Sequence, residues 1–219
     1  MTYSLNEIEA MGKRATRGAG LDWGLAEEAG KAVRWLSACR LPGARALAEV
    51  LRVTEGKTYD DLAPVSADGI WRAPSGPLSP LQVGPAITDR AASLAAGHVI
   101  EIGEITKPLL LIPYLGAAAK LTKTNLEITW LGVNVIVTPN GVSVQGDQVN
   151  DSKASDVRCR RQSNTPQSTS VQVTQAQVTG CDVDGETWDC LGQYMGRYLA
   201  PDTEQSRIAG AGAGLSDND

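Results

Sequence analysis

The sequence contains no phenylalanine and only one histidine among its 219 residues. Leucine, isoleucine, valine, five tryptophans and five tyrosines must therefore fill the interior. A zinc site with two or more histidine ligands is excluded, because His98 is the single imidazole. Any catalytic arrangement that pairs a serine or a cysteine with a histidine would also have to use His98.

Segments that direct a protein to or across a membrane are missing too. Residues 1–7 have neither the basic segment nor the apolar segment of a secretory signal. The most apolar stretch, Leu109–Ala119, is about half the length that spans a bilayer and contains Pro113 and Gly116. The four cysteines form no C-x-x-C pair, so reduced thiols are expected. These features predict a cytoplasmic protein without a membrane partner.

The common nucleotide-binding motifs and a basic charge balance are absent as well. There is no Walker A sequence and no G-x-S-x-G element around any serine. The glycine-rich segments at 18–24 and 210–214 have the wrong spacing or context for binding a dinucleotide. The net charge of −5 argues against a nucleic-acid partner, because phosphates favour a basic surface. We expect no cofactor and no nucleic acid.

The amino-acid composition is that of an ordinary globular protein, because 42% of the residues are apolar. This composition excludes a wholly disordered chain. The length suits one domain, 1–219. We predict an α+β fold, with an N-terminal helical hairpin or bundle packed on a largely antiparallel sheet, and a C-terminal helix. The expected parts are a helical part (1–53), a long connection with a short helix (54–97), a β-sheet part (98–180), a helix (181–200) and a Gly/Ala-rich acidic tail (201–219).

Local signals support the helices and the long connection. Ser4 and Glu7 have the spacing of a capping box, and apolar residues follow at helical intervals. Asp184 is expected to cap the last helix. Residues 54–84 are rich in glycine and proline, which indicates a connection. Trp71 is expected to anchor this connection to the core; a lid over a site is the alternative.

From His98 onward the apolar residues alternate as they do in a strand. His98, Ile100, Ile102 and Glu104 are expected to share one face. His98 and Glu104 are too far apart along such a strand to act as a pair.

Further along, Leu109–Ile112 is predicted to be a buried strand, because it is a short and uninterrupted apolar run. Residues 138–141, with the sequence Thr-Pro-Asn-Gly, predict a hairpin turn. Residues 155–162 and 168–179 are more polar and are expected to be edge strands.

Three features suggest functional residues. Trp23 precedes adjacent glutamates in a predicted helix, Glu104 lies on an apolar strand face, and the glycine-rich tail ends in acids. Carboxylates whose pKa is raised by burial can act as general acids or bases near neutral pH. The candidate catalytic residues are Glu104, Glu28 and His98, and the candidate ligand-binding residues are Trp23, Arg207, Asp217 and Asp219.

Two classes of function follow from these features. The first is a small-molecule-binding protein, or a small-molecule enzyme that uses carboxylate acid–base chemistry. No metal site is predicted. If the protein binds a metal ion, the available ligands suit an all-oxygen site for Mg²⁺ or Mn²⁺. The alternative is a non-catalytic subunit or homodimer, because polar strands at 155–179 can pair with a partner. Glu28 also has a structural interpretation, since acids stabilise the first turns of a helix.

Three segments of the chain resemble a bacterial family of unknown function. They are Ser4-Leu-Asn-Glu-Ile-Glu, Trp23-Gly-Leu-Ala-Glu-Glu-Ala-Gly30, and Ala200-Pro-Asp-Thr-Glu-Gln-Ser-Arg207 with the Gly/Ala strip that follows it. The resemblance implies a bacterial, cytoplasmic, single-domain protein. It implies no catalytic residues.

Overall fold

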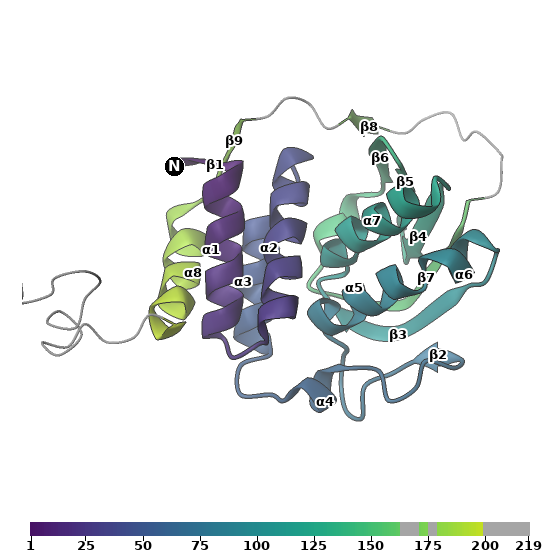
Figure 1. The fold of residues 1–219 in the computed structure, drawn as a ribbon, viewed down its shortest axis with the longest axis horizontal. Helices are drawn as coiled ribbons and strands as arrows, with labels where there is room; N and C mark the ends of the chain where they lie inside the picture. The colour runs from purple at the N-terminus through teal and green to yellow at the C-terminus, as the bar shows by residue number, and fades with distance from the viewer. Residues whose placement is uncertain (163–170, 175–178, 199–219) are drawn as a thin grey trace, which may run out of the picture.

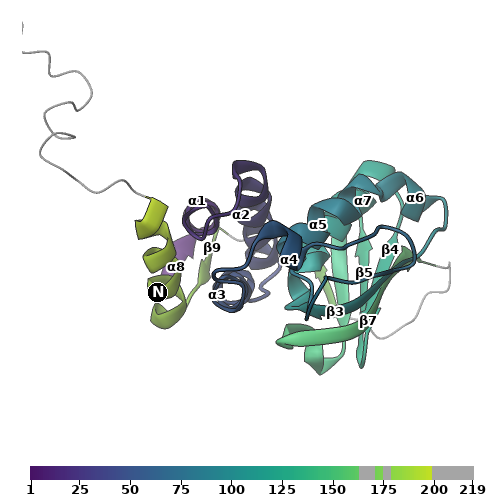
Figure 2. The same ribbon diagram turned by 90° about the horizontal axis from the view of Figure 1, so that it is seen from below.

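A computed structural model describes residues 1–162, 171–174 and 179–198, and shows an α+β fold. One layer consists of four helices, α1, α2, α3 and α8. The other is a seven-stranded sheet with α5, α6 and α7 on one of its faces (Figure 1). Figure 2 shows the same three helices on the same side of the strands. The N-terminal helices pack on the sheet layer mainly through contacts of α2 and α3 with α5, α7 and η1.

The helical layer forms where the sequence predicts helices. The Ser4 hydroxyl accepts from the Glu7 amide and the Glu7 carboxylate accepts from the Ser4 amide, which completes the capping box. Asp184 caps the last helix by accepting from the Thr187 amide at 2.8 Å. The helices of this layer are α1 (Leu5–Gly18), α2 (Trp23–Ala38), α3 (Gly43–Val53) and α8 (Gly185–Tyr198).

A two-stranded antiparallel sheet joins the start of the chain to the segment before α8. It consists of β1 (Thr2–Ser4) and β9 (Gly180–Asp182). The Tyr3 ring stacks on Trp188 of α8, with ring centroids 3.6 Å apart. These contacts hold α8 beside α1.

The large sheet is antiparallel except at its first pair. Its strand order is β2-β3-β7-β4-β5-β6-β8, and only β2 and β3 run parallel. The hairpin turn predicted at 138–141 is confirmed, because it joins β5 to β6 with Thr138 paired to Gly141. The strands are β2 (Ile70–Trp71), β3 (Ile100–Thr106), β4 (Leu126–Trp130), β5 (Val133–Thr138), β6 (Gly141–Gln145), β7 (Lys153–Arg161) and β8 (Val171–Thr174).

The remaining described helices lie before and within the β part. They are α4 (Tyr59–Leu62), α5 (Pro80–Asp89), α6 (Ala91–Ala95), the 3₁₀ helices η1 (Pro108–Leu111) and η2 (Asp147–Asn150), and α7 (Ile112–Thr122). Trp71 is buried at 2% exposure, so it anchors the connection to the core as expected.

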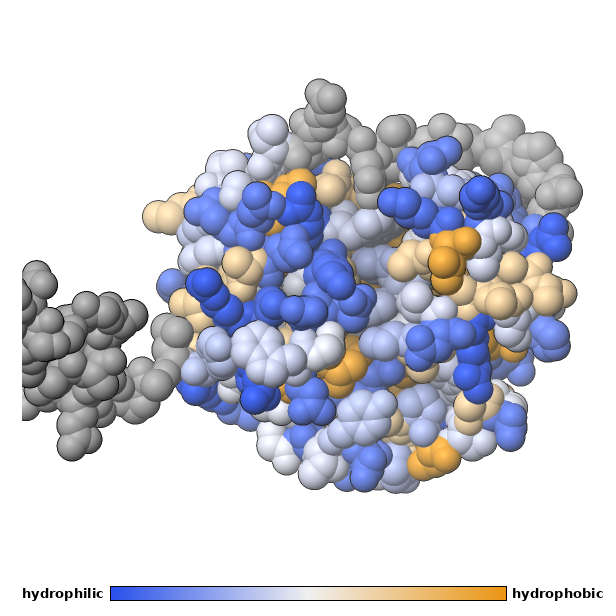
Figure 3. Space-filling model, in the orientation of Figure 1, coloured by the Kyte–Doolittle hydropathy of each residue, from blue (hydrophilic) through white to orange (hydrophobic). Residues whose placement is uncertain are grey.

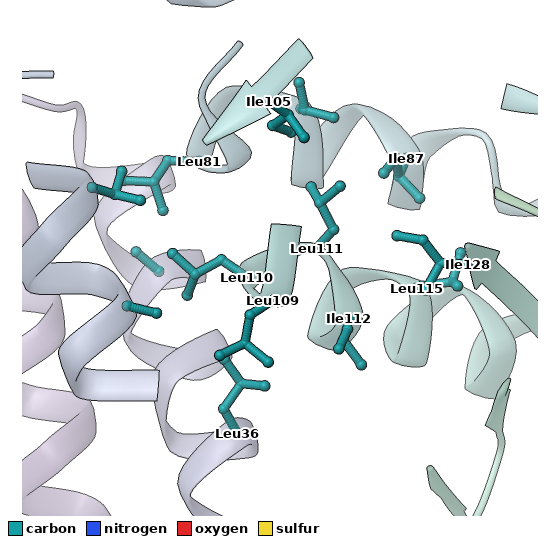
Figure 4. Packing of buried hydrophobic residues seen from close by; sticks show 14 of the residues in the cluster. Leu36, Leu81, Ile87, Ile105, Leu109, Leu110, Leu111, Ile112, Leu115 and Ile128 are labelled. Carbon is teal, nitrogen blue, oxygen red and sulfur yellow. The ribbon is translucent and has the colours of Figure 1, made fainter. Parts of the chain in front are cut away.

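One hydrophobic cluster includes residues of both layers. Leu109 packs beside Leu36 of α2, and Leu115 lies beside Ile128 of β4 (Figure 4). The segment from η1 into α7 therefore contributes to the packing of the helices and of the sheet. On the face seen in Figure 3, hydrophilic side chains predominate over α1 and α2, and hydrophobic ones form small separate groups.

Two predictions of secondary structure were wrong. Leu109–Ile112 is buried as expected, but it is helical and not a strand. A short apolar run does not distinguish the two, whereas Pro108 and Pro113 each suit the first turn of a helix. The connection expected at 54–84 is also shorter, because α5 begins at Pro80 with Ser79 as its cap. Pro85 lies inside this helix.

The expected edge position of residues 155–162 was also wrong. They belong to β7, which lies between β3 and β4 in the interior of the sheet. Its arginines pair with carboxylates of the neighbouring strands, Arg158 with Glu101 at 3.1 Å and Arg160 with Glu127 at 2.6 Å. Such cross-strand pairs allow a central strand to carry many charges on one face.

Within the described ranges, no helix is long and apolar enough to cross a membrane. The expected tail, 201–219, lies outside the described residues.

The close contact of α1 with α8 at Gly18 gives a first prediction. A Cβ on Gly18 would lie 1.8 Å from the Tyr194 carbonyl oxygen, so the two helices would have to separate. We expect Gly18→Ala to lower the free energy of unfolding by about 1–3 kcal/mol in urea denaturation.

Gly192→Ala, within α8, is the matched control. Among the described residues, no atom outside the neighbouring backbone of α8 lies within 4 Å of its added Cβ, so the helix propensity of alanine should raise stability by up to about 1 kcal/mol. Equal effects of the two substitutions would contradict the close packing at Gly18.

Candidate functional site

A cavity of about 250 Å³ lies between α2, α7 and the turn that joins β5 to β6. Three segments far apart in the sequence line it: residues 28–35, residues 113–120 and residues 138–141. We call it the Tyr114 cavity. It is somewhat smaller than the pockets of about 300–1,000 Å³ that hold drug-sized ligands. Its volume therefore suits a ligand of single-ring size.

Helical periodicity brings the lining residues of each helix to one side. On α2, Glu28, Ala32 and Trp35 follow at intervals of four and three residues. On α7, Pro113, Gly116 and Lys120 follow at intervals of three and four residues. Residues separated by three or four positions share a helix face. The predicted hairpin turn supplies the third wall.

Tyr114 is the most unusual residue of this cavity. Its side chain is only 3% exposed, and its buried hydroxyl oxygen has no hydrogen-bond partner among the residues that the structure describes. Burial raises the pKa of the Tyr114 phenol far above its usual value, and the charge of Glu28 raises it further. The phenol therefore stays protonated at neutral pH and is a donor without an acceptor. Buried polar groups are rarely left in this state.

The position of the Tyr114 ring depends on a glycine. The ring packs against the backbone of Gly84 in α5, where an added Cβ would lie 2.3 Å from a ring carbon. Trp35 of α2 lies beside Gly116, where an added Cβ would lie 3.4 Å from the indole, close to ordinary van der Waals contact. The close approach of α5 and α7 at Gly84 therefore holds the Tyr114 ring in place.

The charged groups of the cavity give it a positive excess. Glu28 pairs with Lys31 at 2.7 Å, and this hydrogen bond raises the pKa of Lys31. Lys120 is exposed and forms no ion pair with any residue that the structure describes. One positive charge therefore stays uncompensated at the cavity wall.

The three candidate catalytic residues do not come together. Glu28 lines the cavity. Glu104 lies on β3, but it is exposed and pairs with Lys153 at 3.2 Å, so the expected apolar surroundings were wrong. On the neighbouring strand β7, Asp156 has a φ of +54 and lies between the residues that pair with Ile102 and Glu104. The burial pattern of β3 changes here, so that Ile105 is buried where the alternation predicts Glu104.

His98 does not belong to that strand, so its expected place on the strand face was also wrong. β3 begins at Ile100, and His98 lies in the exposed turn after α6. Its Nδ1 is 3.2 Å from the Ser93 carbonyl oxygen. Gly97, with φ +101, ends the helix and separates the two elements.

The candidate ligand-binding residues are divided between two regions. Trp23 is half-exposed at the start of α2, with Lys13 and Arg17 over its ring and Tyr198 at its edge. It does not line the Tyr114 cavity. Arg207, Asp217 and Asp219 lie outside the described residues. In the described ranges, no group of three or more His, Cys, Asp or Glu side chains is placed to hold a metal ion.

Sequence reasoning missed Tyr114, Lys120 and Trp35. Tyr114 and Lys120 follow the apolar run that was assigned to a strand, and strand periodicity gives no reason to place them beside Glu28. A helical assignment would have put Pro113, Gly116 and Lys120 on one face. That spacing was the available signal.

The unpaired phenol gives a second prediction. We expect Tyr114→Phe to raise the free energy of unfolding of the ligand-free protein by about 1–3 kcal/mol, because it removes a buried donor that lacks an acceptor. Tyr194→Phe is the control. The Tyr194 hydroxyl donates to Glu55 at 3.1 Å, so its removal should cost about 0.5–1.5 kcal/mol. Urea denaturation measures both, and equal losses in the two variants would contradict this account.

Comparison with known proteins connects only part of this structure to a family. No curated protein matches the chain significantly. Residues 3–78, roughly a third of the chain, match the family described as "Protein of unknown function (DUF3726)". The match includes α1, α2 and α3, and therefore the Glu28, Lys31 and Trp35 wall of the cavity. The resemblance of the N-terminal segments to a family of unknown function is confirmed over residues 3–78.

Proposed function

We propose that this protein binds a small molecule in the Tyr114 cavity. The observation that supports the proposal is Tyr114, which lines the cavity and whose buried hydroxyl has no acceptor among the described residues. Leaving such a donor unpaired costs about 1–3 kcal/mol, which a ligand acceptor would recover on binding. The unpaired hydroxyl thus lowers the stability of the ligand-free protein, and a bound ligand would restore that stability.

The walls of the cavity indicate the chemical class of the ligand. Trp35, Pro113 and Pro139 supply flat or apolar surface, which suits a planar ring. Lys120 supplies the uncompensated positive charge, which suits an anionic substituent. We therefore propose a single-ring ligand with a carboxylate or similar anion at one end and an oxygen acceptor at the other.

Acid–base catalysis in the same cavity is the second candidate function. The observation that favours it is the position of Glu28 on the cavity wall, with Lys31 hydrogen-bonded to it. In this proposal Glu28 accepts a proton from the bound ligand while Tyr114 donates a hydrogen bond to the oxygen that becomes negative. Glu28→Gln should then keep ligand affinity and abolish turnover.

The proposed location is the bacterial cytoplasm. All four cysteines are free. Two of them are buried, and burial raises the pKa of Cys39 to about 11 and that of Cys159 to about 12. Such thiols are unreactive and suit a reducing compartment.

Ligand binding is tested by thermal melting with 4-hydroxybenzoate, which has the proposed shape and charge. At about a hundred times its dissociation constant a ligand adds roughly 2.7 kcal/mol, or about 5–10 °C for a chain of this size. We expect this shift in the wild-type protein. The uncharged analogue 4-hydroxybenzamide should give a smaller one.

Two variants show whether the shift arises in this cavity. Tyr114→Phe and Lys120→Gln should each reduce it, because they remove the donor and the positive charge. Lys57→Gln, a lysine that does not line this cavity, should leave it unchanged. A shift that survives both cavity variants, or no shift with any single-ring anion, would refute the proposed site.

A further inference from the structure

A second cavity, of about 230 Å³, lies between the end of α3, the connection that follows it and the end of β3. Its polar lining includes Glu49, Lys57, Lys107 and Lys153. It shares no lining residue with the Tyr114 cavity. We call it the Lys107 cavity.

Lys107 combines two features that are unfavourable for a lysine. It is only 5% exposed, although charged side chains are rarely buried, and its backbone has φ +41, in the left-handed region. Its amide donates to the Ser152 carbonyl oxygen at 2.8 Å. Residues held in such conformations cluster at binding and catalytic sites.

The described residues provide two partners for the Lys107 ammonium. Its Nζ donates to the Asn150 carbonyl oxygen at 3.1 Å and forms an ion pair with Glu49. An ammonium group carries three N–H donors, so one is left for a ligand. Lys107 is also one of the residues that line the cavity.

The charges around the cavity favour an anion. Three lysines, Lys57, Lys107 and Lys153, line the cavity together with one acidic residue, Glu49. Lys153 is shared with Glu104 at 3.2 Å, whereas Lys57 forms no ion pair with any residue in the described ranges. A concave surface with this excess of positive charge concentrates small anions.

We propose that the Lys107 cavity binds a phosphate group, either as inorganic phosphate or in a small phosphate monoester. The lysines compensate its charge. Glu49, which accepts from Arg45 and Lys107, has further lone pairs and accepts a hydrogen bond from the P–OH of a singly protonated phosphate. Sulfate carries no such hydrogen at neutral pH, so the carboxylate selects the singly protonated form of phosphate over sulfate.

The test is a titration of the full chain followed by amide NMR, with phosphate and sulfate at equal ionic strength. We expect saturable shifts of the Thr54, Lys57 and Lys107 amides, and about tenfold weaker binding of sulfate. Lys57→Glu reverses an exposed charge at the cavity and should weaken phosphate binding by about tenfold. Lys123→Glu, at an exposed lysine that lines neither cavity, is the matched control and should leave the affinity unchanged.

The outcomes separate this proposal from the proposed function and distinguish the two sources of phosphate. Tighter binding of glycerol 3-phosphate than of inorganic phosphate identifies a monoester as the ligand, and the reverse order identifies the free ion. The absence of saturable shifts, equal affinity for sulfate and phosphate, or an unchanged affinity in Lys57→Glu would each overturn the Lys107 site. None of these results changes the expectation for 4-hydroxybenzoate at the Tyr114 cavity.

Discussion

The packing of the segment from Lys107 to Lys120 between the two layers is the constraint on which the rest of the structure depends. Leu109, Leu110 and Leu111 are consecutive and fully buried, which requires apolar neighbours on every side of the chain. α2 supplies them on one side and the sheet layer on the other (Figure 4). Each buried leucine contributes about 1.5–3 kcal/mol, so this short run is a major part of the shared core. It also positions both cavities, because the segment begins at Lys107 and continues through Tyr114 to Lys120.

Much of the fold could be predicted because its signals are local. The capping box at Ser4, the cap at Asp184 and the turn at 138–141 depend on residues a few positions apart, and the structure has all three. Leu109–Ile112 was assigned wrongly because four apolar residues satisfy a buried strand and a buried helix equally. The position of β7 inside the sheet could not be predicted, because the charges of Arg158 and Arg160 are balanced by strands distant in sequence.

The candidate sites were harder to predict, for the same physical reason. Glu28 could be singled out as a carboxylate, but its neighbours Tyr114 and Asn140 come from segments that only the tertiary fold brings together. Lys107 gave no signal, since a lysine in a sequence indicates an exposed position and nothing nearby predicts its pairing with Glu49. His98 and Glu104 were chosen from a strand pattern, and both are exposed. Tyr114 and Lys107 are buried, whereas His98 and Glu104 are not, and the burial of a residue depends on the whole fold.

The central claim is that the buried Tyr114 hydroxyl gains its acceptor from a small ligand. A crystal structure of the protein with bound 4-hydroxybenzoate tests it most directly. The account predicts a ligand oxygen about 2.5–3.0 Å from Tyr114 Oη, with the carboxylate of the ligand toward Lys120. A ligand bound elsewhere, or a Tyr114 hydroxyl that donates to a protein carbonyl in the complex, would contradict it.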